Sequence, residues 1–215
     1  MADPYPPYQY FDRGEVRGLD HDLISAVLEQ LGYQVETVLL PWEACLQRLD
    51  RGEAHGAFQV TRTPERERRY LFSRQLRTAE TALFARRGLG IHLDPLSPLE
   101  DQLRGVRIGM MEGYSYHPAI DTLPAHRAAS QEDLLWSVAE GRLDVVVMDT
   151  GVAEYLMRRL GLPTLPRVKG FVAARDLHAV FRMDCRELLE QFDAEIERMI
   201  AEGVPGRIAE VYGLA

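Results

Sequence analysis

The segment Thr61-Arg62-Thr63-Pro64-Glu65-Arg66 carries the residue types best suited to binding an anionic ligand. Thr63, Pro64 and Glu65 form a helix start, with an N-cap hydroxyl, a proline at the first helical position and an acid in the first turn. This pattern places Arg66 one turn into the helix. Because its planar guanidinium can donate two parallel hydrogen bonds to one carboxylate, Arg66 is a candidate carboxylate-binding residue. The alternative is a surface arginine between two glutamates.

Polar residues also stand at the ends of two predicted strands. Thr61 ends one strand, with Gln59 two residues earlier on the same face. Asp149 ends the apolar run VVVMD, where an acid is costly unless it has a partner. Capping of the helix that follows Asp149 competes with a ligand role. Ligands gather at the carboxyl ends of strands in open α/β sheets, so these positions are candidates for ligand contact.

A glycine loop and several aromatic residues complete the candidate site. In Glu112-Gly113-Tyr114-Ser115 the glycine frees the backbone, and a helix N-terminus after it would point amides at an anion; a simple turn is the alternative. Tyr5 and Trp42 offer large apolar surfaces of fixed geometry, although Trp42 could equally be core packing. Weaker candidates for setting ligand selectivity are Phe58, Glu112 and Tyr116.

Helical and strand patterns alternate along nearly the whole chain, which predicts an α/β fold with largely parallel sheets. The predicted helices are 23–31, a short helix through Leu49, 131–140, 151–160, 187–201 and a last one ending at Tyr212. The predicted strands are 35–40, 56–61, 81–87, 106–110, 143–148 and 177–183. Residues 88–98, rich in Gly and Pro, are predicted to be a linker.

Two stretches of the chain share one plan. Residues 45–61 and 134–150 each show a helix, a glycine (Gly52 or Gly141), a polar residue (His55 or Asp144) and an apolar strand. Chance similarity is the alternative; a real repeat indicates two similar lobes.

Composition excludes several function classes. The 215 residues are 46% hydrophobic and 27% charged, as in ordinary globular proteins. A net charge of -8 argues against a nucleic-acid or anionic-membrane surface. No apolar run approaches the roughly 18 residues of a membrane helix. The opening residues have no basic n-region or apolar h-region, so we expect no signal peptide within this chain.

The sequence shows no metal or cofactor motif. Cys45 and Cys185 form no metal or redox spacing, and we expect free thiols, with a disulfide between them left open. We expect no catalytic residues, no metal site and no cofactor.

The ordered series of motifs resembles the extracellular amino-acid-binding proteins of bacterial ABC uptake systems, solute-binding protein family 3. The matching stretches are DPYPPYQY (3–10), GLDHDLISAVLEQLG (18–32), LPWEACLQRLDRGE (40–53), TRTPERERRYLFS (61–73), LRGVRIGMMEGYSY (103–116), EGRLDVVVMDTGVAEYL (140–156) and the closing IAEVYGL. Two features depart from the family: His55 stands where it usually has Asp, and its opening β-strand has almost no counterpart ahead of Asp3.

The resemblance implies roles for individual residues. Arg66 and Thr61 would hold the α-carboxylate of the ligand, while Asp149 would pair with its α-ammonium. In the family loop Ser115 keeps a hydroxyl and Tyr114 replaces a small residue. Tyr5 and Trp42 would surround the ligand side chain, and the Gln59 position usually contributes through its backbone.

The resemblance also implies a two-lobed periplasmic-binding-protein (venus flytrap) fold. Each lobe would be a mostly parallel sheet flanked by helices, with lobe 1 formed by residues 1–86 and 178–215 and lobe 2 by 87–177. Two hinge strands, 81–87 and 177–183, would join the lobes and let them close around the ligand.

The implied function is capture of a small carboxylate, an amino acid or close relative, by a monomeric periplasmic or extracytoplasmic receptor that serves an ABC permease. Two alternatives remain open at this stage. One is a ligand-sensing domain of a membrane signalling protein. The other is a prephenate or arogenate dehydratase-like enzyme, in which Glu112 or His117 would act as general acid.

Overall fold

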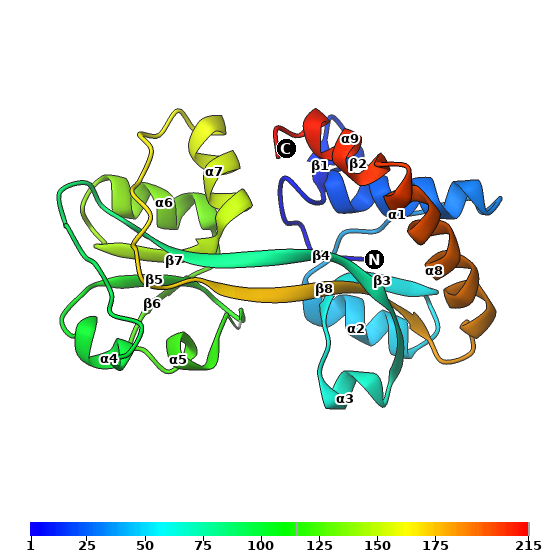
Figure 1. The fold of residues 1–215 in the computed structure, drawn as a ribbon, viewed down its shortest axis with the longest axis horizontal. Coiled ribbons are helices and arrows are strands. Elements are labelled where there is room, and N and C mark those ends of the chain that lie inside the picture. Colours follow the sequence, from blue (N-terminus) through cyan, green and yellow to red (C-terminus); the bar gives the residue numbers. More distant parts are fainter. Residues whose placement is uncertain (115, 215) are drawn as a thin grey trace. The chain divides into compact units, whose positions relative to one another are not determined.

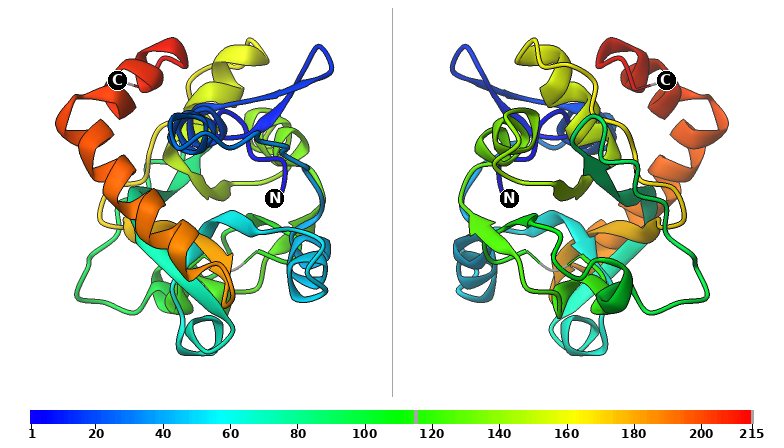
Figure 2. Two further views of the ribbon diagram at one scale, coloured as in Figure 1. Left: turned by 90° about the vertical axis from the view of Figure 1, so that its right-hand side faces the viewer. Right: turned by 90° about the vertical axis from the view of Figure 1, so that its left-hand side faces the viewer.

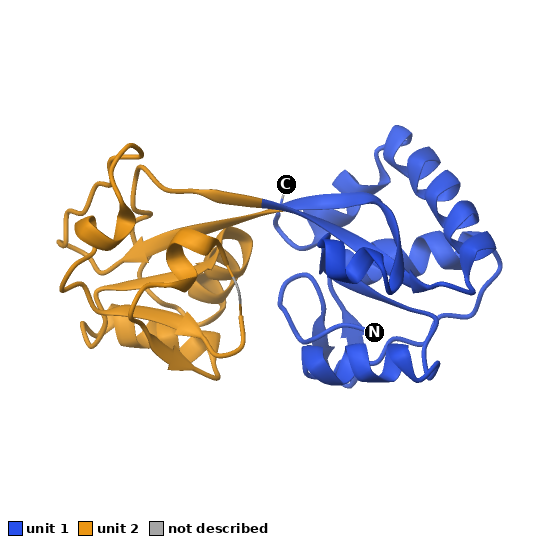
Figure 3. Ribbon diagram, turned by 90° about the horizontal axis from the view of Figure 1, so that it is seen from below, with its two compact units in different colours: residues 1–78, 175–215 blue, residues 79–174 orange. Residues whose placement is uncertain are grey.

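The computed structural model of the protein describes residues 1–114 and 116–214. Two compact units make up the chain: unit 1 is Met1–Thr78 with Arg175–Ala215, and unit 2 is Ala79–Ala174 (Figure 3). The strands β4 (Tyr70–Ala85) and β8 (Ala173–Arg182) both run from one unit into the other.

Strands and helices alternate along the chain from Gly56 to Ala201, whereas two strands and two helices precede this stretch and one more helix follows it (Figure 1). The other strands are β1 (Tyr10–Asp12), β2 (Glu15–Arg17), β3 (Gly56–Thr61), β5 (Ile108–Met111), β6 (His126–Ala128) and β7 (Val145–Asp149). The helices are α1 (Leu19–Gln30), α2 (Trp42–Asp50), α3 (Pro64–Glu67), α4 (Leu99–Gln102), α5 (Pro118–Asp121), α6 (Gln131–Ala139), α7 (Thr150–Arg159), α8 (Arg186–Ala201) and α9 (Val204–Val211).

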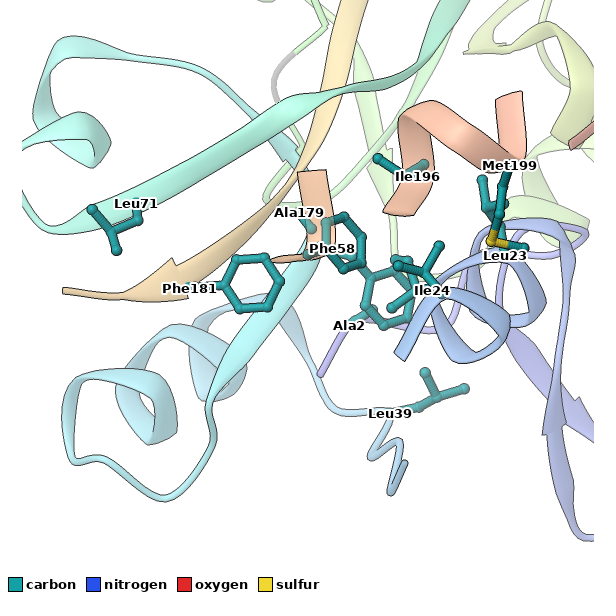
Figure 4. Packing of buried hydrophobic residues seen from close by; sticks show 12 residues of the cluster. Ala2, Leu23, Ile24, Leu39, Phe58, Leu71, Ala179, Phe181, Ile196 and Met199 are labelled. Carbon is teal, nitrogen blue, oxygen red and sulfur yellow. The ribbon is translucent and has the colours of Figure 1, made fainter. Parts of the chain in front are cut away.

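Unit 1 is built on an antiparallel pair of strands, β3 and β8, covered by helices on both faces. One face carries Phe58 and Phe181, which pack into a core with α1 and α8 (Figure 4). The other face carries Ala57 and Val180, which pack against Leu49 of α2. The apolar residues of α1 recur at helical spacing and therefore lie on one side of the helix, which is buried against the strands.

Unit 2 contains a sheet whose hydrogen-bonded order is β4-β7-β5-β6. β7 is antiparallel to β4 and parallel to β5, while β6 is parallel to β5. Every residue of β7 is buried, as expected for a central strand covered on both faces. The right-hand view of Figure 2 shows α6 and α7 on one side of this sheet and α4 and α5 on the other.

The predicted repeat is present in both units. α2 leads through Gly52 into β3, and α6 leads through Gly141 into β7. Both glycines have positive φ values, 74° and 76°. In both units the backbone carbonyl of the residue just before the strand accepts a hydrogen bond from the neighbouring antiparallel segment. His55 O accepts from Arg182 N of β8, and Asp144 O accepts from Arg86 N just after β4.

The two-lobed α/β prediction is confirmed, with a difference in strand direction. The six-stranded sheet β3-β8-β4-β7-β5-β6 is mixed, because β3 pairs antiparallel with β8 and β4 with β7, while β5 is parallel to both β7 and β6. β4 and β8 are the predicted connecting strands, but the chain crosses between units at 78/79 and 174/175. The lobe limits at 86/87 and 177/178 stay a prediction.

Two predicted elements are wrong. Residues 33–38 form no strand, and within 35–40 the structure has one bridge, between Leu39 and Ala2. A strand requires a partner along its length, and Ala2 supplies a single residue. Residues 88–98 are no linker but belong to unit 2, where Leu93 is fully buried and His92 bridges to Lys169.

Candidate functional site

Arg66 is positioned by the helix start that the sequence predicts. The Oγ1 of Thr63 accepts a hydrogen bond from the backbone N–H of Arg66 at 3.3 Å, and Pro64 opens α3. This cap fixes the backbone of Arg66 one turn after the end of β3.

The side chain of Arg66 turns back onto β3 and α2. Its Nη1 donates to the Oγ1 of Thr61 at 2.7 Å and to the backbone carbonyl of Thr61 at 3.0 Å. Its guanidinium carbon lies 5.4 Å from the ring centroid of Trp42, within the range of a cation–π contact. The structure therefore brings together three of the predicted site residues.

Arg66 and the exposed Arg68 have no ion-pair partner among the described residues, unlike Arg62 and Arg69, and of the two only Arg66 is partly buried. Arg62 pairs with Glu67 at 3.1 Å, and Arg69 pairs with Asp50. Burial lowers the pKa of the Arg66 guanidinium from its ordinary value, more than nearby Glu65 raises it. A partly buried guanidinium that has no carboxylate in an ion pair with it can be stabilised by an anionic ligand.

A second cluster in unit 1 contains Gln59 and Tyr5. Gln59 Nε2 donates to Asp20 Oδ2 at 2.9 Å, and Arg77 Nε donates to both oxygens of Asp20 at 2.9 and 3.0 Å. The Arg77 guanidinium carbon lies 3.4 Å from the centroid of the Tyr8 ring, which in turn stacks on Tyr5 at 6.0 Å. The cluster thus connects α1, β3, β4 and the Pro-rich opening loop.

Gln59 has an unusual backbone. Its φ is +64°, and the register between β3 and β8 shifts between Ala57 and Val60. Left-handed backbone is costly for a residue with a Cβ, so its persistence indicates that the surrounding contacts hold it there. The amide of the Gln59 side chain is engaged by Asp20 inside unit 1.

Sequence reasoning missed Asp20, Arg77 and Tyr8. Asp20 is 3% exposed despite standing in the first turn of a helix, where acids are ordinarily solvated. Its partner Arg77 lies 57 residues away. No local pattern signals such a pair; the nearest hint is the acid inside the GLDHDL run.

In unit 2, Asp149 caps a helix. It is 1% exposed, and its Oδ1 accepts from the backbone N–H of Val152 at 3.2 Å at the start of α7. Across the strands it pairs in register with Thr81 of β4. The capping role raised by the sequence is therefore present, and the ligand role stays a prediction.

The other predicted residues of unit 2 lie around the loop that follows β5. Tyr114 is partly buried, and its ring meets that of Tyr116 at 6.2 Å. Ser115 lies outside the described residues. Because β5 and β7 are parallel neighbours, this loop and Asp149 both follow the carboxyl ends of adjacent strands.

Several weaker candidates have structural roles. Phe58 packs in the core of unit 1, and the hydroxyl of Tyr116 accepts from the backbone N–H of Met111 at 3.1 Å. Nδ1 of His117 accepts from Ala119 N at 3.2 Å and caps α5, whereas Glu112 is exposed.

Other classes of site would need reactive or paired thiols, clustered metal ligands or a membrane-spanning helix. Cys45 and Cys185 are free thiols. Within residues 1–114 and 116–214, no group of three or more His, Cys, Asp or Glu side chains is arranged to hold a metal ion. In the same residues, every helix falls short of the length and apolarity that a membrane crossing needs.

Two proteins of Bacillus subtilis (strain 168) are similar to the chain in sequence. The arginine-binding extracellular protein ArtP is 24% identical over 206 residues, which cover 93% of this chain and 78% of that protein. The probable amino-acid-binding protein YxeM is 24% identical over 164 residues, covering 73% of this chain and 60% of that protein.

Solved structures share the fold over nearly the whole chain. A histidine kinase sensor domain with similarity to periplasmic binding proteins superimposes with a TM-score of 0.83 at 23% identity, covering 98% of this chain and 93% of that one. An ancestral arginine-binding protein bound to arginine gives 0.81 at 21% identity, with coverages of 98% and 95%. The P235GK mutant of ArgBP from T. maritima gives 0.80 at 19%, with coverages of 100% and 93%.

The family assignment rests on the full length of the chain. All of residues 1–215 match the family described as bacterial extracellular solute-binding proteins, family 3. The chain belongs to this family.

Proposed function

We propose that the protein binds a small ligand that carries a carboxylate, an amino acid or a close relative, and that Arg66 holds this carboxylate. The proposal rests on the environment of Arg66. Its side chain is partly buried, contacts Thr61 and Trp42, and forms no ion pair among the described residues. Its Nη1 is used by Thr61, which leaves the remaining N–H donors of the fork for a ligand.

The ligand's other groups would be recognised by the remaining predicted residues. Tyr5 and Trp42 would contact its side chain. From unit 2, Asp149 would pair with its ammonium group, and the loop at Tyr114 and Ser115 would direct backbone amides at its carboxylate. Contacts made only when both units engage the ligand would favour a closed form, which is the basis of capture by closure.

The similar proteins support an amino acid as the ligand class. ArtP is named as arginine-binding and YxeM as probably amino-acid-binding. We extend that class to this chain because every α-amino acid presents the same α-carboxylate, which is the group that Arg66 would bind.

The biological role that we propose is that of a receptor outside the cytoplasm which delivers its ligand to an ABC permease. The family is described as extracellular, which supports this location. Binding would require neither a cofactor nor catalysis.

A thermal-shift screen against the amino acids and related carboxylic acids tests the proposal. A ligand that binds only the native state adds roughly 2.7 kcal/mol of stability at a hundredfold excess over its Kd, so a true ligand raises Tm clearly. We expect one or a few amino acids to do so, and Arg66→Ala to abolish the shift while its own Tm stays close to that of the wild type.

Arg62→Ala is the matched control, since Arg62 lies in the same segment but is already paired with Glu67. It should retain the ligand-induced shift. A full shift in Arg66→Ala, or equal loss in both variants, would show that Arg66 does not bind the carboxylate.

A further inference from the structure

Thr81 of β4 is a polar side chain in an otherwise apolar, buried stretch of unit 2. It is 0% exposed, and its Oγ1 has no hydrogen-bond partner among residues 1–114 and 116–214. The side chains that follow it in the strand, at 82–85, are Ala, Leu, Phe and Ala. A buried hydroxyl without a partner costs stability, and valine would fill the same space without that cost. Packing of the sheet therefore does not account for a threonine at this position.

Thr81 stands directly opposite Asp149, the last residue of β7. Side chains of directly opposed residues in an antiparallel pair lie on the same face of the sheet. The next register pairs on this face are Leu83–Val147 and Ala85–Val145. All four of these residues pack in one apolar cluster of unit 2. Thr81 and Asp149 therefore continue, at the end of the two strands, the face that this cluster covers.

The backbone brings the side chains of this pair close together. Leu83 O accepts from Val168 N, so the backbone groups of Leu83 point away from β7. Thr81 lies two residues earlier in the strand and has the same backbone orientation. Thr81 and Asp149 are consequently a pair without mutual backbone hydrogen bonds. In such pairs the Cα atoms are about 4.5 Å apart and the side chains approach more closely than in the hydrogen-bonded type.

Two hydrogen bonds hold the surroundings of the pair in place. Asp149 Oδ1 accepts from Val152 N at the start of α7, and Thr150 Oγ1 donates to Glu80 O at 3.1 Å. The second bond joins the start of α7 to the residue just before Thr81. Because Thr81 is β-branched, its χ1 angle is also restricted. The hydroxyl of Thr81 and the carboxylate of Asp149 are therefore held in a fixed arrangement.

The residues that follow β5 lie on the same face of the sheet. Tyr116 belongs to the apolar cluster that contains Leu83, and Tyr114 packs against that cluster. Because β5 and β7 are parallel neighbours, these tyrosines and Asp149 all follow the carboxyl ends of adjacent strands. Thr81 thus lies on the face of unit 2 where the residues predicted to contact the ligand are found.

We propose that Thr81 is a specificity residue for the amino group of the ligand: the ligand ammonium donates one N–H to Thr81 Oγ1 and another to the carboxylate of Asp149. The inference rests on the proposed function, in which Asp149 pairs with that ammonium. A primary ammonium has three N–H donors, and each needs an acceptor when the group leaves water. Thr81 then favours α-amino acids over carboxylic acids that lack an amino group.

A permanently bound water at Thr81 is the competing explanation, and the two differ in their effect on stability. A hydroxyl that a buried water satisfies in the ligand-free protein stabilises the fold, so its removal lowers Tm. A hydroxyl that only the ligand satisfies destabilises the ligand-free protein. Its removal therefore keeps or raises the ligand-free Tm while it weakens binding, as is common at functional sites.

The test measures Tm without ligand, and Kd by calorimetry, for the wild type, Thr81→Val and Thr81→Ser. The ligands are the amino acid found in the screen and the same acid with hydrogen in place of its amino group. We expect Thr81→Val to keep or raise the ligand-free Tm and to bind the amino acid about tenfold or more weakly, while its affinity for the acid without the amino group stays within about twofold of the wild type. Thr81→Ser keeps the hydroxyl and should restore most of the affinity. Thr122→Val, at an exposed threonine of the same unit, is the control and should change neither quantity.

Three results would overturn the proposal. A lower ligand-free Tm in Thr81→Val would assign the hydroxyl to a permanent partner such as a buried water. Undiminished affinity for the amino acid would remove Thr81 from the ligand site. Equal loss of affinity for both acids would show that the substitution disturbs the site as a whole. The proposed function fails by a different result, wild-type affinity in Arg66→Ala, so the two failures are distinguishable.

Discussion

At the scale of single residues, unit 1 contains two arginines in opposite electrostatic states. Arg77 is almost buried and is neutralised by both oxygens of Asp20. Arg66 is partly buried and has no ion pair among the described residues. A paired arginine stabilises the fold, whereas an unpaired one is available for an anion. Partial burial together with the absence of an ion pair, and not arginine as a residue type, marks the ligand-binding candidate.

The buried pair should contribute strongly to stability. Asp20→Asn leaves the mostly buried Arg77 without its counter-charge; breaking a fully buried pair typically costs about 3–5 kcal/mol, and we expect a loss near the lower end of that range. We expect urea unfolding to show a loss of this size. Asp12→Asn, at an exposed position in β1, is the control and should change the unfolding free energy by less than about 0.5 kcal/mol. Equal stability of the two variants would contradict the assignment of Asp20 and Arg77 as a structural pair.

The sequence predicts those contacts of the candidate site that are local along the chain, and it does not predict those that join distant segments. Thr61, Thr63 and Arg66 lie within six residues, so their contacts follow from one strand end and one helix start. The contact of Asp20 with Arg77 joins α1 to β4, and local patterns contain no information on such a long-range contact. The left-handed backbone of Gln59 is likewise set by contacts across unit 1 and not by its residue type.

At the scale of elements, the sequence predicts the long periodic segments well, whereas it misses short elements that lack a local signal. α6, α7 and α8 lie within one residue of their predicted limits at each end, because each buries an apolar stripe of helical spacing. α4 and α5 have four residues each and are too short to show a period. The predicted strand at 35–40 was wrong because its apolar alternation finds only Ala2 as a pairing partner among the described residues.

Two substitutions at Asp149, the N-cap of α7, distinguish its helix-capping role from the proposed ligand role. Asp149→Asn keeps an oxygen that can accept from Val152 N, and asparagine caps helices as well as aspartate does, so stability should change little. Asp149→Ala loses the cap and should cost about 0.5–2 kcal/mol in urea unfolding. Both variants should lose affinity for the ligand if the carboxylate pairs with its ammonium group. Wild-type affinity in Asp149→Asn would limit Asp149 to capping.

At the scale of the whole molecule, the chain repeats one helix–strand plan in two units. The repeat explains why both units end a strand with polar residues, at Thr61 in β3 and Asp149 in β7. The chain crosses between the units twice, within β4 and β8.

The central claim is that Arg66 binds the carboxylate of the ligand. Its most direct test is calorimetric titration of the amino acid found in the screen, and of the same amino acid as its carboxamide, into the wild type and Arg66→Ala. Loss of either partner of a hydrogen-bonded charge pair costs about 2–5 kcal/mol, which is about 30-fold or more in Kd. We predict that the wild type prefers the acid by at least this factor and that Arg66→Ala binds both forms weakly and alike. Equal affinity of the wild type for acid and carboxamide, or an undiminished preference for the acid in Arg66→Ala, would contradict the claim.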